Sequence, residues 1–431
     1  MAADISTMSA ILKDAYGDYV RSFNDQCFIW DNALAGGKDS FVGLRAVHYI
    51  STKRTNGIGA RADGDPLPTA GNQLGKRVSI PMRRTYGRIQ LSRPLMKQAI
   101  GGNGSFADEL DVEMEGCRKD YVRDICRQVW GQSNGVIARC ASNSTVTVTL
   151  HSSATEYEVS QIFSDGGMRV DIGTVADPDY AASGVEVTDH GGSSGAYTIT
   201  LATAPIQSVT SSHYVFRHGA GGATDDSGND NDGQREITGL QTAVSATTTL
   251  HTLSVSNGSK QWQSIVNDNS GTTRPVTETL LMKVAMEASN KSGFDVDGAF
   301  CNRGVMLALI AMLIASKRHT VPISGENTRL KLQAGAGGIV LNIPAWGANS
   351  SGMLPVFADR DCPGNSLYGI HFGSIKKYQL TEPEWVDDDG AILSRVSGYD
   401  AFEAYLAGYQ ELGYVRRNAH WKIADLTEAS S

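Results

Sequence analysis

The sequence has few of the features that mark membrane, secreted or metal-binding proteins. Its longest apolar run, residues 304–315, is shorter than the roughly 20 residues that a membrane-spanning helix needs. The start, MAADISTMSA, has no basic segment followed by an apolar one, so we expect no secretory signal. The six cysteines lie far apart without a C-x-x-C pair, which argues against a zinc module and a disulfide-rich scaffold. We therefore expect a protein that is made and used inside a cell.

Positive charge and catalytic motifs are also scarce. The 38 basic and 46 acidic side chains leave a net charge of -8, which disfavours tight DNA binding by the whole chain. The nine histidines form neither H-x-x-x-H nor H-E-x-x-H, so metal catalysis has no support. GGSSG at residues 191–195 matches G-x-S-x-G, but predicted strands flank it on both sides, whereas a nucleophile elbow joins a strand to a helix. We expect no enzyme, no cofactor and no metal site.

What is present indicates a chain of several domains. Its 431 residues exceed the usual size of one domain, and 41% of them are hydrophobic, enough to build more than one core. The 47 glycines indicate many turns and close backbone approaches.

Basic residues are concentrated before the middle of the chain. Residues 38–104 hold twelve lysines or arginines against three acids. Within this segment, residues 76–97 hold seven basic residues and no acid. Polar and apolar residues alternate at 77–80 and again at 88–91, as they do in strands. We predict a long basic hairpin from these two strands. A solvated face of an ordinary sheet is the alternative, since charge runs often mark exposure alone.

A long helix is predicted over residues 105–130. Ser105 is followed three residues later by Asp108, a variant of the capping box. Apolar residues then recur at steps of three and four, and Arg123 and Arg127 come late, where the helix dipole favours them. The narrow apolar stripe suits a helix that lies along a sheet.

The composition changes again at residues 141–216. This segment has no lysine, one arginine and eight acids, with many threonines, valines and glycines. Short strand-like runs separated by glycine-rich turns predict a small antiparallel β-barrel. Residues 219–234 follow with no apolar anchor beyond alanine and are expected to form a mobile loop.

The rest of the chain mixes helices and strands. We expect helices at 276–290, 303–316 and 400–406, strands at 298–301, 354–361, 367–372 and 410–415, and a hairpin turn at 387–390. The second helix is almost wholly apolar and should be buried. Because tight turns join the adjacent strands, the predicted class is α+β.

The segment NGIGARADGDPLPTAGNQ at residues 56–73 closely resembles part of the major capsid proteins of tailed bacteriophages. YGRIQL at 86–91 resembles the returning strand of that family, residues 8–16 its N-terminal arm, and RRNAH at 416–420 its last strand. Together these resemblances span most of the chain. Encapsulins and the herpesvirus capsid floor share this capsid fold.

The resemblance implies a division of the chain into seven parts. These are an N-terminal arm (1–55), an extended loop (56–97), the spine helix and start of a peripheral domain (98–140), an inserted β-barrel (141–217), a mobile loop with a return to the peripheral domain (218–275), an axial domain (276–380) and the completion of the peripheral domain (381–431).

In this family the extended loop lies across a neighbouring subunit, so the resemblance gives the basic hairpin a partner. The implied contact residues on the loop are Arg61, Lys76, Arg77, Arg83, Arg84 and Arg88. Acidic residues of an adjacent spine helix are their expected partners, namely Asp108, Glu109, Asp111, Glu113 and Glu115. Some family members also cross-link this loop through a lysine, for which Lys76 is a weak candidate.

The implied function is that of a shell subunit. Copies would assemble into hexamers and pentamers of an icosahedral virion capsid in the host bacterial cytoplasm, enclosing double-stranded DNA without binding it tightly. No fused scaffold is recognised, so a separate scaffolding protein, a portal and decoration proteins are the expected partners. Two alternatives remain: an encapsulin-like compartment, and a β-rich hydrolase or adhesin that works through residues 141–216 with Ser193.

Overall fold

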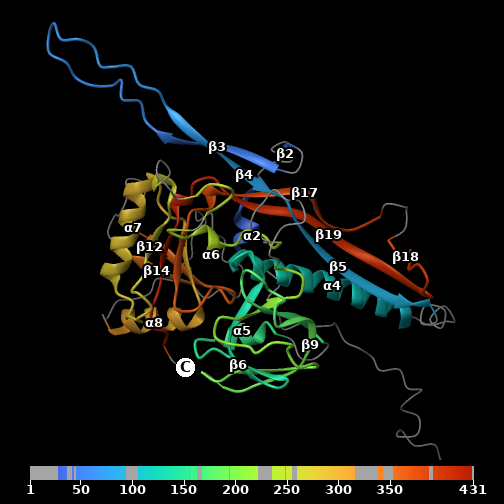
Figure 1. Ribbon diagram of the computed structural model, residues 1–431. Helices are drawn as coiled ribbons and strands as arrows, with labels where there is room; N and C mark the ends of the chain where they lie inside the picture. The colour runs from blue at the N-terminus through green and yellow to red at the C-terminus, as the bar shows by residue number, and fades with distance from the viewer. Residues whose placement is uncertain are drawn as a thin grey trace, which may run out of the picture.

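The chain folds into a body with two extensions and a small barrel (Figure 1). The computed structural model describes residues 28–35, 41–42, 45–93, 105–154, 156–162, 167–193, 195–221, 235–247, 249–254, 260–315, 338–342, 353–387 and 392–429. Within these ranges, no helix combines the length and the apolar character required to cross a membrane.

A long sheet forms one of the two extensions. Its central strand β19 (Ala401–Tyr414) lies between β5 (Arg83–Ser92) on one side and β17 (Ile375–Trp385) and β18 (Ser394–Arg395) on the other. The short strand β1 (Leu34–Ala35) extends the sheet beyond β17 in parallel. The antiparallel register of β19 with β5 runs from Ala401 opposite Ser92 to Gln410 opposite Arg83.

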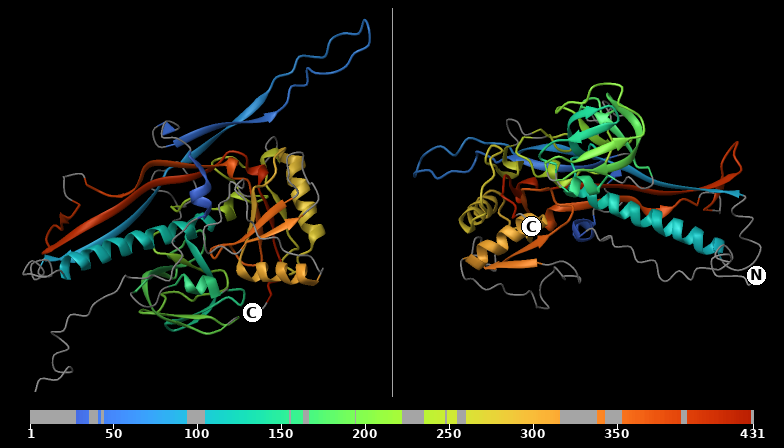
Figure 2. Two further views of the ribbon diagram at one scale, coloured as in Figure 1. Left: turned by 180° about the vertical axis from the view of Figure 1, so that it is seen from behind. Right: turned by 90° about the horizontal axis from the view of Figure 1, so that it is seen from below.

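The helix α4 (Ser105–Trp130) lies along this sheet (Figure 2). Its buried residues include Tyr121, Ile125 and Val129, spaced four apart on one face. Two strand glycines permit the close approach, because a Cβ at Gly408 would lie 2.1 Å from the Tyr121 hydroxyl and one at Gly87 would lie 2.9 Å from the Cys117 sulfur. The helix and the sheet therefore fit each other closely.

A second, six-stranded sheet forms the centre of the body. Its order is β12 (Ile265–Asn267), β20 (Trp421–Ile423), β16 (Leu367–Ile370), β13 (Gly298–Cys301), β15 (Met353–Ala358) and β14 (Gly338–Asn342). The helices α7 (Glu278–Ser292) and α8 (Arg303–Ala315) pack against it. Trp130, the last residue of α4, meets this sheet through ring contacts with Phe300 and Tyr368, so the two sheets share one core.

Six strands between α4 and α6 (Leu240–Ala243) form a closed barrel. They are β6 (Val136–Ser144), β7 (Thr147–Leu150), β8 (Arg169–Gly173), β9 (Ala182–Gly191), β10 (Thr198–Leu201) and β11 (Tyr214–Arg217). All neighbouring pairs are antiparallel, and alternate side chains fill a separate apolar core. The helix α5 (Glu156–Ser160) lies within this segment.

A hairpin forms the second extension. The strand β3 (Arg45–Lys53) pairs antiparallel with β4 (Leu74–Pro81), and the short strand β2 (Phe41–Val42) joins β3 on its other edge. The hairpin, including residues 54–73, projects from the body (Figure 1). The remaining short elements are α2 (Phe28–Asn32), η2 (Lys260–Trp262), η3 (Phe372–Ser374) and η4 (Arg417–Ala419).

The predicted pairing of the basic hairpin is wrong, although both of its strands exist. The segment at 77–80 belongs to β4 and pairs with β3, whereas the segment at 88–91 belongs to β5 and pairs with β19. Only Met82 separates β4 from β5. Because a tight hairpin needs a loop of at least about two residues, the chain continues past Met82 instead of turning back. The projecting hairpin therefore spans residues 45–81.

Most of the other predicted helices are present in the structure, and two predictions near the C-terminus are wrong. The helices at 105–130, 276–290 and 303–316 and the strand at 298–301 are confirmed within two residues. The helix predicted at 400–406 is wrong, because these residues begin the long strand β19. Residues 416–420 form the turn η4 before the last strand instead of the strand itself.

The sheets are also more mixed than the α+β prediction assumed. Strands 353–358 and 367–370 do not pair with each other, because β13 lies between them and runs parallel to β15. The six-stranded sheet further contains a parallel pair of β12 and β20. The last 50 residues are divided between both sheets, which differs from the single return implied by a boundary at residue 381. The N-terminal segment 8–16, most of the loop 219–234 and most of the turn 387–390 lie outside the described residues.

Candidate functional site

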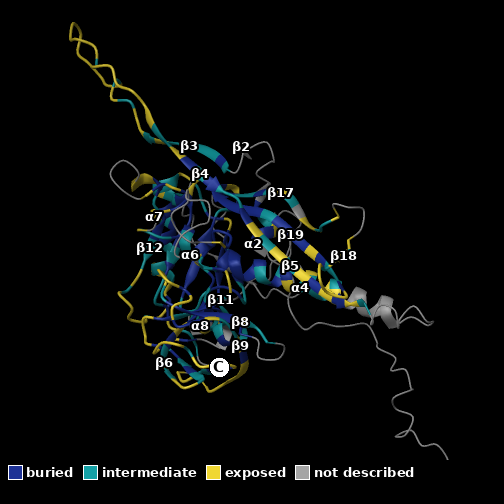
Figure 3. Cartoon of the chain, turned by 45° about the vertical axis from the view of Figure 1, so that its right-hand side comes forward, coloured by how far each residue is buried: buried dark blue, intermediate teal, exposed yellow. Residues whose placement is uncertain are grey.

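The hairpin exposes large apolar side chains at its far end. Ile58 is 84% exposed and Leu67 is 87% exposed, and both belong to the segment 54–73 that joins β3 to β4. Figure 3 shows this end as an almost wholly exposed ribbon outside the body. Apolar groups held so far from any core are typical of a surface that another molecule covers.

Hydrogen bonds within the hairpin give its tip a defined shape. Arg61 donates from Nε to the Pro66 carbonyl at 3.1 Å and from a terminal nitrogen to the Ala60 carbonyl at 2.9 Å. The Ala62 N–H donates to Asp65 Oδ2 at 3.3 Å, across a turn in which Gly64 has φ +84. The tip is thereby organised before any partner binds.

The two legs of the hairpin approach each other closely below the tip. A Cβ at Gly71 would lie 2.6 Å from the backbone nitrogen of Asn56, so only glycine fits there. On the leg that follows β3, the Gly57 N–H donates to Thr55 Oγ1 at 3.2 Å. These glycines belong to the segment whose sequence carries the family resemblance.

The base of the hairpin is fixed to the body. Ala46 of β3, Ile80 of β4 and Tyr378 of β17 form a small buried cluster. His48 contacts the Tyr378 hydroxyl through Nε2. The Ser79 N–H donates to Thr252 Oγ1 at 3.4 Å. The hairpin thus extends outward from a packed base.

The predicted basic contact residues have three different environments. Arg61, Arg77 and Arg84 are exposed, and Lys76 is half-buried on β4. Arg88 is 53% exposed and forms an ion pair with Glu403 at 2.5 Å, so its charge is already matched within the chain.

Arg83 differs most from the prediction because it is buried. Its Nε lies 3.2 Å from Glu411 Oε2, and the Glu411 side chain is wholly buried. Burial raises the pKa of Glu411 to about 7, while Arg83 and the N–H donors of Thr238 and Leu412 oppose the rise. Arg83 therefore ties β5 to β19 inside the molecule, where its guanidinium is not accessible to another subunit.

The predicted acidic partners on α4 are only partly described. Glu113 and Glu115 are exposed, whereas the side chains of Asp108, Glu109 and Asp111 lie outside the described residues. Glu115 accepts from Arg118 at 2.8 Å and lies 3.7 Å from Lys119. The hydrogen bond from Arg118 lowers the pKa of Glu115. Its charge is thus paired on the helix itself.

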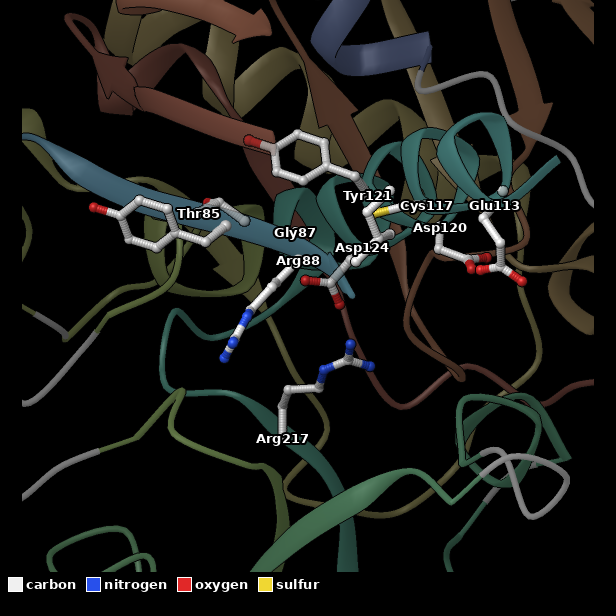
Figure 4. A pocket seen from close by; sticks show the side chains of 12 residues that line it. Thr85, Gly87, Arg88, Glu113, Cys117, Asp120, Tyr121, Asp124 and Arg217 are labelled. Carbon is white, nitrogen blue, oxygen red and sulfur yellow. The ribbon is translucent and has the colours of Figure 1, made fainter. Parts of the chain in front are cut away.

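A pocket of about 480 Å³ lies between β5, α4 and the barrel (Figure 4). Arg88 reaches it from β5, Asp120 and Cys117 from α4, and Arg217 from β11. Burial and the neighbouring acids Asp120 and Glu113 raise the pKa of the Cys117 thiol, which makes it a poor nucleophile at neutral pH. Burial would raise the pKa of Asp124, but the charges of Arg127 and Arg217 outweigh it and lower that pKa, so the pocket marks the joint between barrel and helix.

Three ion pairs made by two buried arginines of α4 were missed by the sequence interpretation. Arg123 lies 2.9 Å from Asp361, in the loop between β15 and β16, and Arg127 contacts both Asp124 and Glu236. All five side chains are less than 20% exposed. The only signal in the sequence was the late position of both arginines on the helix, which the helix dipole already explains. These pairs connect the helix to the central sheet and to the chain that leaves the barrel.

The serine of the G-x-S-x-G match lies in an ordinary turn. Ser193 follows β9, and its carbonyl accepts from the Ala196 N–H at 2.8 Å before β10 begins. This arrangement of strand, turn and strand confirms the expectation that it is no nucleophile elbow.

Comparisons with known proteins identify the fold. Neither a protein-family model nor a curated protein sequence matches the chain. Among solved structures, the capsid asymmetric unit of cyanophage A-1(L) matches with a TM-score of 0.56 at 13% identity, over 99% of this chain and 100% of that one. The capsid of a native GTA particle matches at 8% identity with a TM-score of 0.48, over 100% and 99% of the two chains. The match to the cyanophage chain shows that this chain has the fold of a phage capsid protein, as its sequence resemblance to tailed-phage major capsid proteins predicts.

Proposed function

We propose that this protein is the major capsid protein of a tailed bacteriophage, a structural subunit that assembles through its projecting hairpin. Copies would form hexamers and pentamers of an icosahedral virion capsid that encloses double-stranded DNA. The observation that carries the proposal is the hairpin itself, an organised and exposed extension with apolar residues at its tip, on a chain with the capsid fold. Such an extension gains stability only when a second molecule covers it.

The parts of the fold have corresponding roles in this proposal. The long sheet with α4 would be the peripheral domain, the six-stranded sheet with α7 and α8 the axial domain, and the barrel an insertion between them. The hairpin of one copy would lie on a neighbour, with Arg61, Lys76 and Arg77 of the hairpin and Arg84 of the adjoining strand β5 facing acids there. Residues Asp108, Glu109, Asp111 and Glu113 of a neighbouring α4 stay the proposed partners for its legs. A scaffolding protein, a portal and decoration proteins would complete assembly in the host cytoplasm.

Net charge suits the proposed contents. A subunit with a net charge of -8 repels a polyanion on average, so the shell would hold DNA without binding it strongly. The exposed cations of the hairpin would be used between proteins, where charge complementarity sets orientation and association rate.

Reversing one exposed cation of the hairpin, Arg77, together with Arg84 of the adjoining strand β5 tests this function. We expect purified wild-type protein to form closed shells visible by electron microscopy, and Arg77→Glu with Arg84→Glu to remain unassembled with unchanged far-UV circular dichroism. The control, Arg77→Lys with Arg84→Lys, keeps both charges and should assemble. Shells formed equally well by the reversed variant would contradict the role of the hairpin, and the absence of shells from wild-type protein under all conditions would contradict the function. Protein cargo in place of DNA in native particles would support the encapsulin-like alternative.

A further inference from the structure

Four asparagines of the chain directly precede a glycine, at residues 56–57, 103–104, 134–135 and 257–258. The first pair belongs to the hairpin and the third directly precedes β6, whereas the other two lie outside the described residues. An asparagine before a glycine is prone to deamidation, because glycine has no Cβ to hinder the approach of its backbone nitrogen to the asparagine side chain. The structure gives the two described pairs opposite environments.

The pair in the hairpin is accessible and weakly held. The Asn56 carboxamide is exposed and makes no hydrogen bond with the described residues. The Gly57 N–H donates only to the side chain of Thr55, at 3.2 Å. No strand pairing restrains this peptide, because β3 ends at Lys53 and β4 begins at Leu74 (Figure 3). Water therefore reaches the carboxamide, and the backbone can rotate without breaking a sheet.

The pair before the barrel is fixed, although its neighbours in the sequence are similar. Asn134 Oδ1 accepts from the Val136 N–H at 3.2 Å. The Gly135 carbonyl accepts from the Arg217 N–H at 2.8 Å, and Gly135 is buried so closely that a Cβ on it would lie 2.4 Å from that of Ala220. Both the side chain and the peptide that would have to move are thus restrained. This pair is a matched control within the same chain.

Deamidation of the hairpin pair needs only water and a solvent base. The Gly57 nitrogen loses its proton to the base and attacks Asn56 Cγ, the bond from Cγ to the side-chain nitrogen breaks, and ammonia leaves. Water then opens the resulting five-membered succinimide at either carbonyl, which leaves aspartate or isoaspartate at this position. One water is consumed and one ammonia is released. The new carboxyl group is ionised at neutral pH and adds one negative charge.

Either product changes the hairpin. Isoaspartate lengthens the backbone by one carbon at the place where the legs are closest, since a Cβ at Gly71 would already lie 2.6 Å from the Asn56 nitrogen. The exposed Ile58 is only two residues away. Residues 54–73 carry two arginines and two aspartates, so the new carboxylate changes their net charge from 0 to -1. A hairpin altered in this way is repelled by the acidic surfaces proposed as its partners.

We propose that Asn56 is a self-modifying residue, which deamidates in the unassembled subunit and thereby withdraws that subunit from shell assembly. The withdrawal rests on the proposed shell function, whereas the reaction depends only on the local structure. In a shell, a neighbouring subunit covers the hairpin and restricts the rotation that ring closure needs. Assembled subunits therefore keep their asparagine, and subunits that stay unassembled lose it.

Mass spectrometry of the folded, unassembled protein tests the reaction. Trypsin releases the two pairs in separate peptides, 55–61 and 128–139, and deamidation makes either one about 1 Da heavier. During storage at mildly alkaline pH, we expect peptide 55–61 to deamidate at least tenfold faster than peptide 128–139. In urea the two rates should agree within about threefold, because unfolding frees the second pair. Digestion in oxygen-18 water marks any reaction that follows unfolding. Equal rates in the folded chain would overturn the proposal.

Assembly of stored protein tests the consequence. Protein in which most of peptide 55–61 is deamidated should need at least a fivefold higher concentration to form shells visible by electron microscopy. The control Asn56→Gln would have to close a six-membered ring, which is far slower, so it should assemble equally well before and after storage. Stored wild-type protein that assembles as well as fresh protein would refute the withdrawal and leave the shell function standing. Fresh protein that forms no shells would instead refute the shell function, and the withdrawal with it.

Discussion

The arginines of α4 divide into two kinds by burial. Arg118 pairs with Glu115 in solvent, with side-chain exposures of 57% and 46%, whereas Arg127 and its partner Glu236 are 9% and 6% exposed. Exposed pairs contribute little because water screens them, but removing one member of a buried pair leaves an uncompensated charge. Arg127 is therefore important for the stability of the fold, whereas Arg118 on the same helix contributes little.

Replacing these two arginines in turn measures the difference. We expect Arg127→Met to lower the free energy of unfolding by about 3–5 kcal/mol, because the carboxylates of Glu236 and Asp124 lose their cation inside the protein. The matched control Arg118→Met should change it by less than about 1 kcal/mol. Urea unfolding of the unassembled protein, followed by tryptophan fluorescence, gives both values. Equal losses would contradict the structural role of Arg127.

Two buried histidines make the fold sensitive to acid. Burial, with a smaller contribution from the nearby charge of Arg417, lowers the pKa of His251 and of His420 to about 3. Both rings are fully or almost fully buried. Below about pH 6.5 the unfolded chain binds protons on these residues that the folded chain does not. Their contribution to stability is thus present above pH 6.5 and is lost as the pH falls towards 3.

A single substitution isolates this effect. We expect the unfolding free energy of wild-type protein to fall between pH 6.5 and pH 4, and His420→Gln to reduce that fall by roughly 1–3 kcal/mol. The amide keeps an acceptor for the His371 N–H, which donates to His420 at 3.3 Å. Urea titrations at five pH values provide the comparison. A variant whose stability falls as steeply as that of wild type would show that His420 does not carry the acid sensitivity.

Helices and strands were predicted correctly where the local spacing of apolar residues is distinctive. The bounds of α4 followed from its apolar spacing. Alternation between glycine-rich turns indicated β7 to β11, whereas the first barrel strand, β6, was not predicted. The segment 400–406 misled because Phe402 and Leu406 are four residues apart, as in a helix, while the surrounding run of fourteen residues is one strand. A window of seven residues does not distinguish a helix from a strand here. The length of the whole segment decides between them.

The pairing of strands that lie far apart in the chain could not be predicted from local sequence patterns. Nothing within residues 77–91 shows that β5 pairs with β19, more than 300 residues later, so β4 and β5 were taken as partners. For the same reason the basic residues were treated as one group, although Arg83 is buried against Glu411 and Arg84 is exposed. In a strand, neighbouring residues point to opposite faces of the sheet. The sequence of β5 alone does not show which face is buried, because that depends on what the sheet packs against.

The helix α8 is less buried than its sequence predicts. Its almost wholly apolar sequence predicted complete burial, yet Leu307 is 45% exposed while Val305 and Leu309 are buried. A helix that is apolar on every side is normally covered on every side. Among the described residues of one copy, the sheet packs against the side of α8 that carries Val305 and Leu309, and Leu307 is left exposed.

For the whole molecule, the barrel can be separated from the fold that surrounds it. It has its own core, and its two ends meet where the Arg217 N–H donates to the Gly135 carbonyl at 2.8 Å. A two-residue link closes such a pair of strands without strain. Arg217 itself should be kept, because its charge helps to lower the pKa of the buried Asp124.

Excision of the barrel therefore separates folding from assembly. Replacing residues 136–216 by two glycines should leave a chain that unfolds cooperatively, with a melting temperature within about 5 °C of that of wild type, because neither sheet loses a strand. The ability of the same chain to form closed shells at concentrations where wild type assembles then shows whether the barrel takes part in contacts between subunits. Electron microscopy and calorimetry of the two proteins side by side measure both properties. A shortened chain that aggregates would show that the barrel is integral to the fold, whereas one that folds and assembles normally would remove the barrel from the contacts between subunits.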